Sequence, residues 1–209
     1  ERAEETQRMI REEGGEASVV QADVTNASEC KRMVEAAAER YGRLDILDNN
    51  VGISRGETVV DVSEEQWDQI MNVNVKSVML TSKYAIPKMI ETGGGSIINI
   101  SSITGMRALS RTPYSTSKGA IIALTKSMAA DHGKDNIRVN TICPTFVNTP
   151  MVKEFFKDKK FMKRMFDNIP LGRFGTVSDV ATAVVFLSSN ASSMMTGSSL
   201  MIDGGWTAK

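Results

Sequence analysis

The sequence has little histidine and little cysteine, and both shortages narrow the chemistry it can perform. It contains one histidine and two cysteines in 209 residues. A single histidine excludes the usual Ser-His-Asp triad and histidine-rich metal sites unless His132 itself takes part, and we expect His132 in a surface or C-terminal turn of a helix. Cys30 and Cys143 lie far apart without CxxC spacing, so we expect buried, reduced thiols. We therefore expect no metal site.

The sequence also lacks net charge and long apolar runs. Twenty-five basic residues balance 25 acidic ones, which gives no support to a nucleic-acid partner or to an anionic membrane. No apolar run approaches the length of a membrane span. Hydrophobic residues make up 41% and charged residues 24%, a composition typical of a globular protein with a sizeable core. We expect a single domain over residues 1–209, in the cytoplasm, with no nucleic-acid or membrane partner.

The chain has no initial methionine and no capping residue before its first helical pattern. It opens at Glu1, inside the stretch ERAEETQRMIREEGG. Because helices usually begin at a capping residue, we expect the natural N-terminus to lie upstream. A targeting signal there stays open.

Strand-like and helix-like patterns alternate along the chain. The strand-like stretches are short and apolar, which is typical of an α/β fold with a doubly wound parallel sheet and helices on both faces. Segment 145–175 is less regular, and no repeat or linker interrupts the alternation. We expect strands at 17–24, 44–52, 93–102, 136–144 and 197–205, and helices at 1–15, 28–42, 63–89, 112–133 and 177–189.

Polar or glycine residues follow four of the expected strands. In parallel sheets, ligands bind beyond the carboxyl ends of the strands. Each cluster by itself is explained by turn chemistry, but four clusters in phase predict a binding edge. The clusters are Asp23 and the runs 49–52, 101–102 and 145–149.

Two of the three tyrosines precede a lysine by four residues, so this spacing alone identifies no site. Tyr84 lies in the middle of a long predicted helix, without a strand-end hydroxyl nearby in the sequence, and packing explains it. Tyr114 starts a predicted helix after Pro113, and Ser102 ends a strand twelve residues earlier. A loop of that length allows Ser102, Tyr114 and Lys118 to converge at the binding edge.

These three residue types suit hydride transfer at an alcohol or a ketone. Oxidation needs a base that takes the hydroxyl proton, and reduction needs an acid that gives one. A free phenol, with a pKa of ~10, is poorly matched to neutral pH, whereas an ammonium beside it, together with a positive nicotinamide ring, favours the phenolate. The serine hydroxyl would orient the substrate oxygen and stabilise its developing charge.

The motifs around these residues, in their order and spacing, resemble the short-chain dehydrogenase/reductase family over essentially the whole chain. The resemblance implies a Rossmann-like sheet and an oxidoreductase that uses NAD or NADP on a secondary alcohol or ketone. The stretches that carry it are NNVG (49–52), NVNVKS (72–77), IINISSITG (97–105), YSTSKGA (114–120), IRVNTICP (137–144), and PLGRFGTVSDVATAVVFLSS followed by TGSSLMIDGG (170–205).

The resemblance assigns a catalytic tetrad to Asn74, Ser102, Tyr114 and Lys118. Tyr114 would be the acid–base group, and Ser102 would bind the substrate oxygen. Lys118 would depress the pKa of Tyr114 and hold the nicotinamide ribose. Asn74 would fix a water that links Lys118 to solvent; without the resemblance it is a polar residue in a helix.

The resemblance also implies contacts to NAD or NADP. Asp23 would accept a hydrogen bond from the adenine amino group, beside the backbone amide of Val24. Tyr114 and Lys118 would contribute at the nicotinamide side. The remaining implied contacts are Asn50, Val51 and Gly52 at the adenosine ribose, and Val147 and Thr149 at the nicotinamide carboxamide.

The sequence departs from the family pattern at three points. The glycine-rich phosphate loop TGxxxGxG is absent, so we expect this chain to lack the family's first two strands and the residues that choose between NAD and NADP. Asp48 replaces an apolar strand residue, and we expect it either exposed or, if buried, paired. Thr145 replaces the glycine that usually follows Pro144.

Substrate specificity is expected from segment 150–169, the family's variable lid. Its apolar side chains either close over a substrate or pack against the core. The segment carries six basic and three acidic residues, and Arg107 and Arg111 precede Tyr114. We hypothesise a substrate with an acidic group, the alternative being a solvated helix face. The apolar side chains are Phe155, Phe156, Phe161, Met162, Met165 and Phe166.

Two other functions stay open. A non-catalytic dinucleotide-binding or scaffold protein is the runner-up, because a fold alone does not confer activity. An epimerase or dehydratase that uses transient oxidation would keep the same chemistry, although no sequence feature favours it. The resemblance further suggests a homotetramer with contacts through the helices around 63–90 and 114–133 and through the C-terminal strand.

Overall fold

The chain forms one parallel β-sheet with helices on both faces. The computed structural model describes residues 2–107, 109, 111–149 and 158–208, and in these residues four strands lie side by side in the order of the sequence. All three strand pairings are parallel, which confirms the predicted α/β class. The strands are β1 (Ile46–Asn49), β2 (Gly95–Ile100), β3 (Ile137–Pro144) and β4 (Ser199–Ile202).

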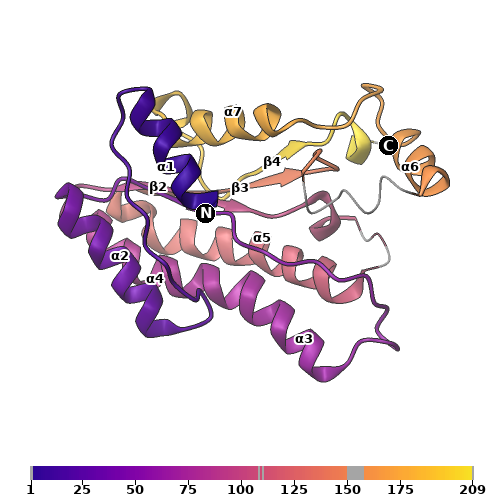
Figure 1. Cartoon of the computed structure of the whole chain (residues 1–209), viewed down its shortest axis with the longest axis horizontal. Helices are drawn as coiled ribbons and strands as arrows, with labels where there is room; N and C mark the ends of the chain where they lie inside the picture. Colours follow the sequence, from indigo (N-terminus) through magenta and orange to yellow (C-terminus); the bar gives the residue numbers. More distant parts are fainter. Residues whose placement is uncertain (1, 108, 110, 150–157, 209) are drawn as a thin grey trace.

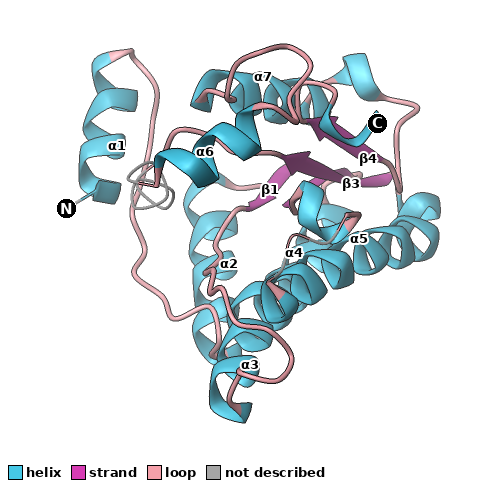
Figure 2. Cartoon of the chain, turned by 90° about the vertical axis from the view of Figure 1, so that its right-hand side faces the viewer, coloured by secondary structure: helices cyan, strands magenta, loops and turns pink. Residues whose placement is uncertain are grey.

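Helices α4 and α5 cover one face of the sheet, and α7 covers the other (Figure 1). Helix α2 packs beside α4, and α3 runs into α4 through a π-helical turn at Asn72–Lys76. Helix α1 buries none of its residues and stands at the margin of the molecule in Figure 2. The helices are α1 (Arg2–Glu12), α2 (Ala27–Tyr41), α3 (Glu64–Met71), α4 (Ser77–Glu91), α5 (Thr112–His132), α6 (Lys159–Phe166) and α7 (Val177–Ser188).

Capping boxes form at the start of two of the described helices. The Ser63 hydroxyl accepts a hydrogen bond from the backbone N–H of Gln66, whose side chain accepts one from the Ser63 N–H. This capping box confirms the predicted start of α3. Thr176 and Asp179 form a second capping box at α7. Each box satisfies backbone donors that would otherwise lack partners, typically worth about 1 kcal/mol.

Apolar clusters fill the space on both faces of the sheet. Ile97 and Val139 pack beneath α4 and α5, whereas Ile98 and Ile142 pack against Leu187 of α7. Successive residues of a strand point to opposite faces, so a strand covered on both sides needs apolar residues at consecutive positions. This explains the short apolar runs of β2 and β3.

Residues 17–24 do not form the buried strand that the sequence predicted. The segment is unpaired, and its side chains are part-buried or exposed. Among the described residues no strand lies beside it, so its backbone N–H and C=O groups have no hydrogen-bonded strand partner. Side chains of α2 bind some of them: Arg32 donates to the Gln21 carbonyl at 2.6 Å, and Glu29 accepts from the Asp23 N–H at 2.8 Å. An apolar pattern favours an extended chain, but a strand also needs a hydrogen-bonded neighbour.

Gly94, before β2, should not tolerate a side chain. Its φ is 121°, and a Cβ there would collide with the backbone carbonyl of Asn136. We expect Gly94→Ala to lower the free energy of unfolding by about 2 kcal/mol or more, measured by urea denaturation. Gly133→Ala is the matched control, because Gly133 has a φ of −59° and no described atom within 4 Å of the added Cβ. Equal losses in both variants would contradict this steric explanation.

Candidate active site

Asn74 lies fully buried in the π-helical turn between α3 and α4. Its side chain binds the backbone of Ile53 twice, accepting from the N–H at 2.8 Å and donating to the carbonyl at 2.9 Å. It also donates to Ser117 Oγ at 3.0 Å, and Ser117 donates to the Tyr114 carbonyl at 2.7 Å. Asn74 therefore ties the loop after β1 to the beginning of α5. Such π turns occur often at functional sites.

Tyr114 and Ser102 meet at the carboxyl end of β2, as the sequence predicted. Pro113 occupies the first turn of α5, where its missing N–H leaves no hydrogen bond unmade. Ser102 follows β2, and its hydroxyl accepts from the Thr104 N–H at 3.2 Å. The Ser102 hydroxyl also lies close enough to the Tyr114 phenol to lower the pKa of that phenol. The loop between them therefore folds back and brings the two hydroxyls together.

Lys118 is 4% exposed, and the backbone of β2 holds its ammonium. Nζ donates to the Ile100 carbonyl at 2.8 Å and lies 5.6 Å from the centre of the Tyr114 ring. Burial lowers the pKa of Lys118 to about 8, an effect that the Cys143 thiol opposes. Burial also raises the pKa of Cys143 to about 11. In the described part of the chain, Tyr114 and Cys143 are the titratable groups that face Lys118.

The pKa of the Tyr114 phenol is raised in this arrangement. Desolvation is the largest cause, and the neighbouring Ser102 hydroxyl and the Arg111 charge oppose it. The depression of this pKa that was expected from Lys118 and a positive nicotinamide ring therefore stays a prediction for the cofactor-bound protein. One feature of Lys118 limits its effect on the phenol: its ammonium is directed to the Ile100 carbonyl.

The surroundings of Lys118 fit a nicotinamide dinucleotide. Gly52 lies against this group, since a Cβ there would stand 3.4 Å from Asn74 Oδ1 and 3.5 Å from Lys118 Nζ. The absent side chain leaves the loop backbone open beside the ammonium. Thr145, just after β3, has a buried hydroxyl without a partner among the described residues. An ammonium and a spare hydroxyl suit the hydroxyls of a ribose and the amide of a nicotinamide.

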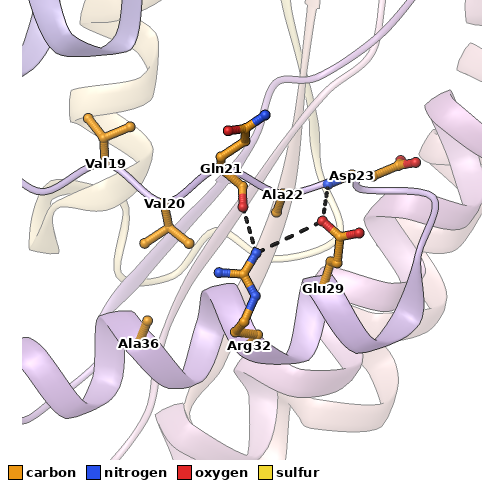
Figure 3. A pocket seen from close by; sticks show the side chains of 8 residues that line it. All are labelled: Val19, Val20, Gln21, Ala22, Asp23, Glu29, Arg32 and Ala36. Carbon is orange, nitrogen blue, oxygen red and sulfur yellow. Dashed lines mark hydrogen bonds and ion pairs between the residues drawn. The ribbon is translucent and has the colours of Figure 1, made fainter.

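Asp23 and Val24 lie apart from the Tyr114 group, at the start of α2. The Asp23 carboxylate accepts from both the N–H and the hydroxyl of Thr25 at 2.8 Å, which lowers its pKa. The predicted adenine contact is not tested by this local turn and stays a prediction. A cavity of about 860 Å³ beside them is lined by Val19, Val20, Gln21, Ala22, Asp23, Glu29, Arg32 and Ala36 (Figure 3).

The other expected cofactor contacts lie in loops at the carboxyl edge of the sheet. Asn50 and Val51 follow β1 and are exposed. Val147 follows β3 and forms an isolated parallel bridge with Gly175, and Thr149 is part-buried. Because β1 and β3 both border β2, these two loops flank the segment that carries the catalytic serine candidate.

The second tyrosine–lysine pair is not a site. Tyr84 packs against the apolar cluster beneath α4, and Lys88 pairs with Glu91 at 3.0 Å, which confirms the predicted packing role. His132 ends α5 with Nδ1 3.0 Å from Asp135 Oδ2, as expected for a C-terminal turn. Both cysteines are buried and free, as predicted.

Asp48 lies on β1 at the edge of the four-stranded sheet and is exposed, in agreement with the first of its two expectations. Desolvation raises the pKa of its carboxyl. Since the residue surface stays open to water, this shift reflects crowding by neighbouring atoms and not a fully buried charge.

Helix α6, in the expected lid, packs against the core. Met162 and Met165 are buried, and Met165 belongs to a cluster with Trp206. The basic residues of α6 are exposed, and Lys163 pairs with Asp167 at 2.8 Å, which favours a solvated face. The lid expectation for Phe155 and Phe156 lies outside the described residues.

Sequence reasoning missed three groups around Lys118. They are the Ile100 carbonyl, the Ser101 hydroxyl, which donates to the Lys118 carbonyl at 2.7 Å, and the Cys143 thiol. Gly105 also approaches α5 closely, because a Cβ there would stand 2.7 Å from the Lys118 carbonyl carbon. Because side chains alternate between the two faces of a strand, the predicted strands would have placed Ser101 and Cys143 on the face that α5 covers.

Within the described ranges, no group of three or more histidine, cysteine, aspartate and glutamate side chains is placed to hold a metal ion. None of the described helices has the length and apolar character to cross a membrane.

Comparison with known proteins places the chain among reductases and dehydrogenases. Residues 1–207 match the family described as enoyl-(acyl carrier protein) reductase. A 3-oxoacyl-[acyl-carrier-protein] reductase of Thermotoga maritima is 40% identical over 184 residues, which are 88% of this chain and 74% of that protein. A 2-dehydro-3-deoxy-D-gluconate 5-dehydrogenase of Dickeya dadantii is 38% identical over 190 residues, which are 90% of this chain and 75% of that protein.

Solved structures share the fold. A short-chain type dehydrogenase/reductase from Mycobacterium ulcerans has a TM-score of 0.95 at 29% identity and covers 99% of this chain and 77% of its own. A gluconate 5-dehydrogenase from Burkholderia cenocepacia, in complex with NADP and tartrate, has a TM-score of 0.94 at 32% identity. The match covers 98% of this chain and 81% of the chain of that dehydrogenase.

Lys118 should make stability depend on pH between pH 8 and 9. Its pKa falls from an ordinary 10.5 to about 8 on folding, so above pH 8 the folded protein loses a proton that the unfolded chain keeps, and stability rises with pH. Cys143 acts in the opposite direction only above its ordinary pKa of 9. We expect the unfolding free energy of the wild type, measured relative to that of Lys118→Met in urea titrations, to rise by about 1 kcal/mol from pH 8 to pH 9. If the plots of unfolding free energy against pH ran parallel for the two proteins, the lowered pKa of Lys118 would be contradicted.

Proposed function

The chain belongs to the short-chain dehydrogenase/reductase family, and on that premise we propose that Tyr114 is the acid–base group of its reaction. The protein is an NAD(P)-dependent oxidoreductase that transfers a hydride between nicotinamide and a secondary alcohol or ketone. The observation that carries the proposal is the meeting of Ser102 and Lys118 at the Tyr114 side chain. A scaffold protein would have no need for a buried lysine beside two hydroxyls, so the catalytic reading is favoured.

The side chains divide the proton chemistry among them. The nicotinamide cofactor, when bound, supplies the hydride acceptor for oxidation and the hydride donor for reduction. Tyr114 Oη takes the hydroxyl proton during oxidation and returns it during reduction. Ser102 Oγ donates to the substrate oxygen and stabilises its developing charge. Lys118 has three N–H donors and uses one on the Ile100 carbonyl, so two are available for ribose hydroxyls.

Asn74 positions the loop that we propose borders the cofactor. Its side chain is bonded to Ile53 and Ser117, and it therefore keeps residues 50–53 against the start of α5. We keep the remaining cofactor contacts as part of the proposal: Asp23, Val24, Asn50, Val51, Gly52, Val147 and Thr149.

Tyr114→Phe should abolish turnover without weakening cofactor binding, because it removes only the proton-transferring oxygen. We expect a loss of at least about 100-fold in kcat. The measurement combines a panel of secondary alcohols and ketones with NAD(H) and NADP(H), and a fluorescence titration of the reduced cofactors. Tyr84→Phe is the control with the same change of side chain, and it should be nearly silent. Equal loss of turnover in both variants would make the assignment of Tyr114 wrong.

We further propose that the substrate carries an acidic group. Arg111 precedes Tyr114 by three residues, donates to Ser54 Oγ at 3.3 Å, and acts electrostatically on the Tyr114 phenol. Burial lowers the pKa of Arg111, and a substrate anion would offset part of this cost. Arg107 instead donates to the Trp206 carbonyl at 3.4 Å. Two of the matched proteins agree with an acidic substrate. The Dickeya dadantii relative is named for a gluconate, and the Burkholderia cenocepacia structure holds tartrate.

Arg111→Gln should lower activity on an acidic substrate more than on the neutral analogue of that substrate. For an alcohol and its carboxylate analogue, we expect kcat/KM to fall at least about tenfold for the carboxylate and little for the neutral compound. The carboxylate should also be the more sensitive to ionic strength. Lys163→Gln, which removes an exposed charge of α6, serves as the control. Equal losses for both substrates would sink the acidic-group proposal and leave the role of Tyr114 untouched.

We also propose a cytoplasmic homotetramer, as the family resemblance suggests. Strand β4 lies at an edge of the sheet that the described residues form, so one side of its backbone is open to pairing. On α4, Met79 and Ile90 are 40% and 45% exposed and offer apolar contact surface. These features support contacts through α4 and the C-terminal strand.

A further inference from the structure

A row of polar side chains crosses the core beneath α4 and α5. This polar row consists of Asn49 on β1, Asn99 on β2, Thr141 on β3, Thr81 on α4 and Thr125 on α5. Four of the five are at most 5% exposed, and Asn49 is part-buried. Apolar side chains usually occupy such positions, so five polar residues at one level of the core require a reason.

The polar row is continuously hydrogen-bonded. Asn49 accepts from Thr81 Oγ1 at 2.7 Å and donates to Asn99 Oδ1 at 2.9 Å. Asn99 then donates to Thr125 Oγ1 at 2.8 Å, and Thr141 Oγ1 donates to the same oxygen at 2.8 Å. Thr125 is therefore the point at which α5 is joined to two neighbouring strands. A satisfied buried network of this kind favours one arrangement of its elements, because any shift leaves polar groups unpaired.

The polar row lies directly beneath the lysine site. Thr125 is seven residues after Lys118, or about two helical turns, and so faces the same side of α5. Asn99 immediately precedes Ile100, whose carbonyl binds the Lys118 ammonium. One step above, Ser101 Oγ donates to the Lys118 carbonyl at 2.7 Å. Helix α5 is thus hydrogen-bonded to β2 at two positions along its axis, Lys118 and Thr125, which are about two turns apart. The partners on β2 and directly after it are the consecutive residues 99–101.

We propose that Thr125 and Asn99 are positioning residues that set the register of α5 on β2 and thereby hold Lys118 at the Ile100 carbonyl. The apolar contacts of α5 are non-directional and tolerate a small slide or rotation of the helix. Hydrogen bonds of 2.8 Å tolerate much less. With the Ser101 contact alone α5 could pivot, whereas two contacts along its axis prevent that movement. The proposal rests on the proposed function only in calling Lys118 part of the active site.

The titration of Lys118 tests this proposal without a substrate. The full chain is labelled with ¹³C at lysine Cε, and the Lys118 signal is assigned by its loss in Lys118→Met. Thr125→Val keeps the shape of the side chain and removes the hydroxyl. We expect it to admit water beside the ammonium and to shift the Lys118 pKa upward by about one unit, towards the ordinary value. Thr125→Ser, which keeps the hydroxyl, should restore the wild-type titration.

A matched control separates positioning from general stability. Ser96 also lies on β2 and is 3% exposed, but its hydroxyl donates to the Leu187 carbonyl on the opposite face at 2.8 Å. Ser96→Ala should lower the melting temperature and leave the Lys118 titration unchanged. If Thr125→Val does not fold, Thr125→Ala provides the same comparison with a smaller side chain.

One result would overturn the proposal: a folded Thr125→Val or Thr125→Ala protein that loses stability, as Ser96→Ala does, while Lys118 titrates as in wild type. Thr125 would then stabilise the core and position nothing. A failure to find any alcohol or ketone substrate would instead count against the proposed function, because the Lys118 titration needs neither substrate nor cofactor.

Discussion

The burial of Lys118 between α5 and the sheet is the constraint on which the rest of the site depends. An ammonium removed from water must be hydrogen-bonded, and the Ile100 carbonyl at the end of β2 meets that need. This is possible only if α5 crosses the sheet at that height with Lys118 facing inward. The same placement puts Tyr114 one turn earlier, at the carboxyl edge where Ser102 lies. A single contact thus links helix register to the geometry of the site.

The face of the sheet beneath α5 changes in character along the strands. Far from the binding edge it is apolar, with Ile97 and Val139 packed under the helices. Nearer the edge comes the polar row, and beyond it lie Ser101, Lys118 and Cys143. The apolar part supplies the burial that stabilises the fold. The polar part makes one arrangement of α5 preferable to its near alternatives, which is what a site with a buried lysine requires.

Local patterns predicted the helices well and the strands less well. All five predicted helices form, the one at 63–89 as α3 and α4 joined by a π-helical turn, and α3 begins at its predicted start after Ser63. Residues 17–24 carry an extended pattern but form no strand, because strand pairing depends on a neighbour that local sequence does not contain. Desolvation raises the pKa of Tyr114 without a cofactor, so the expected depression by Lys118 and a positive nicotinamide ring stays a prediction. The expectation that two strands of the family fold are absent stays a prediction.

The sequence by itself determined the residue types of the site and the order in which they follow the strands. A tyrosine at a helix start, a lysine four residues later and a serine at a strand end are local features, and their motifs identify the family. Only the tertiary structure decided which groups surround them. The Ile100 carbonyl and Cys143 come from β2 and β3, and they reach Lys118 because parallel strands align these two segments beneath α5. Hydrogen bonds over such separations depend on packing, which no local pattern encodes.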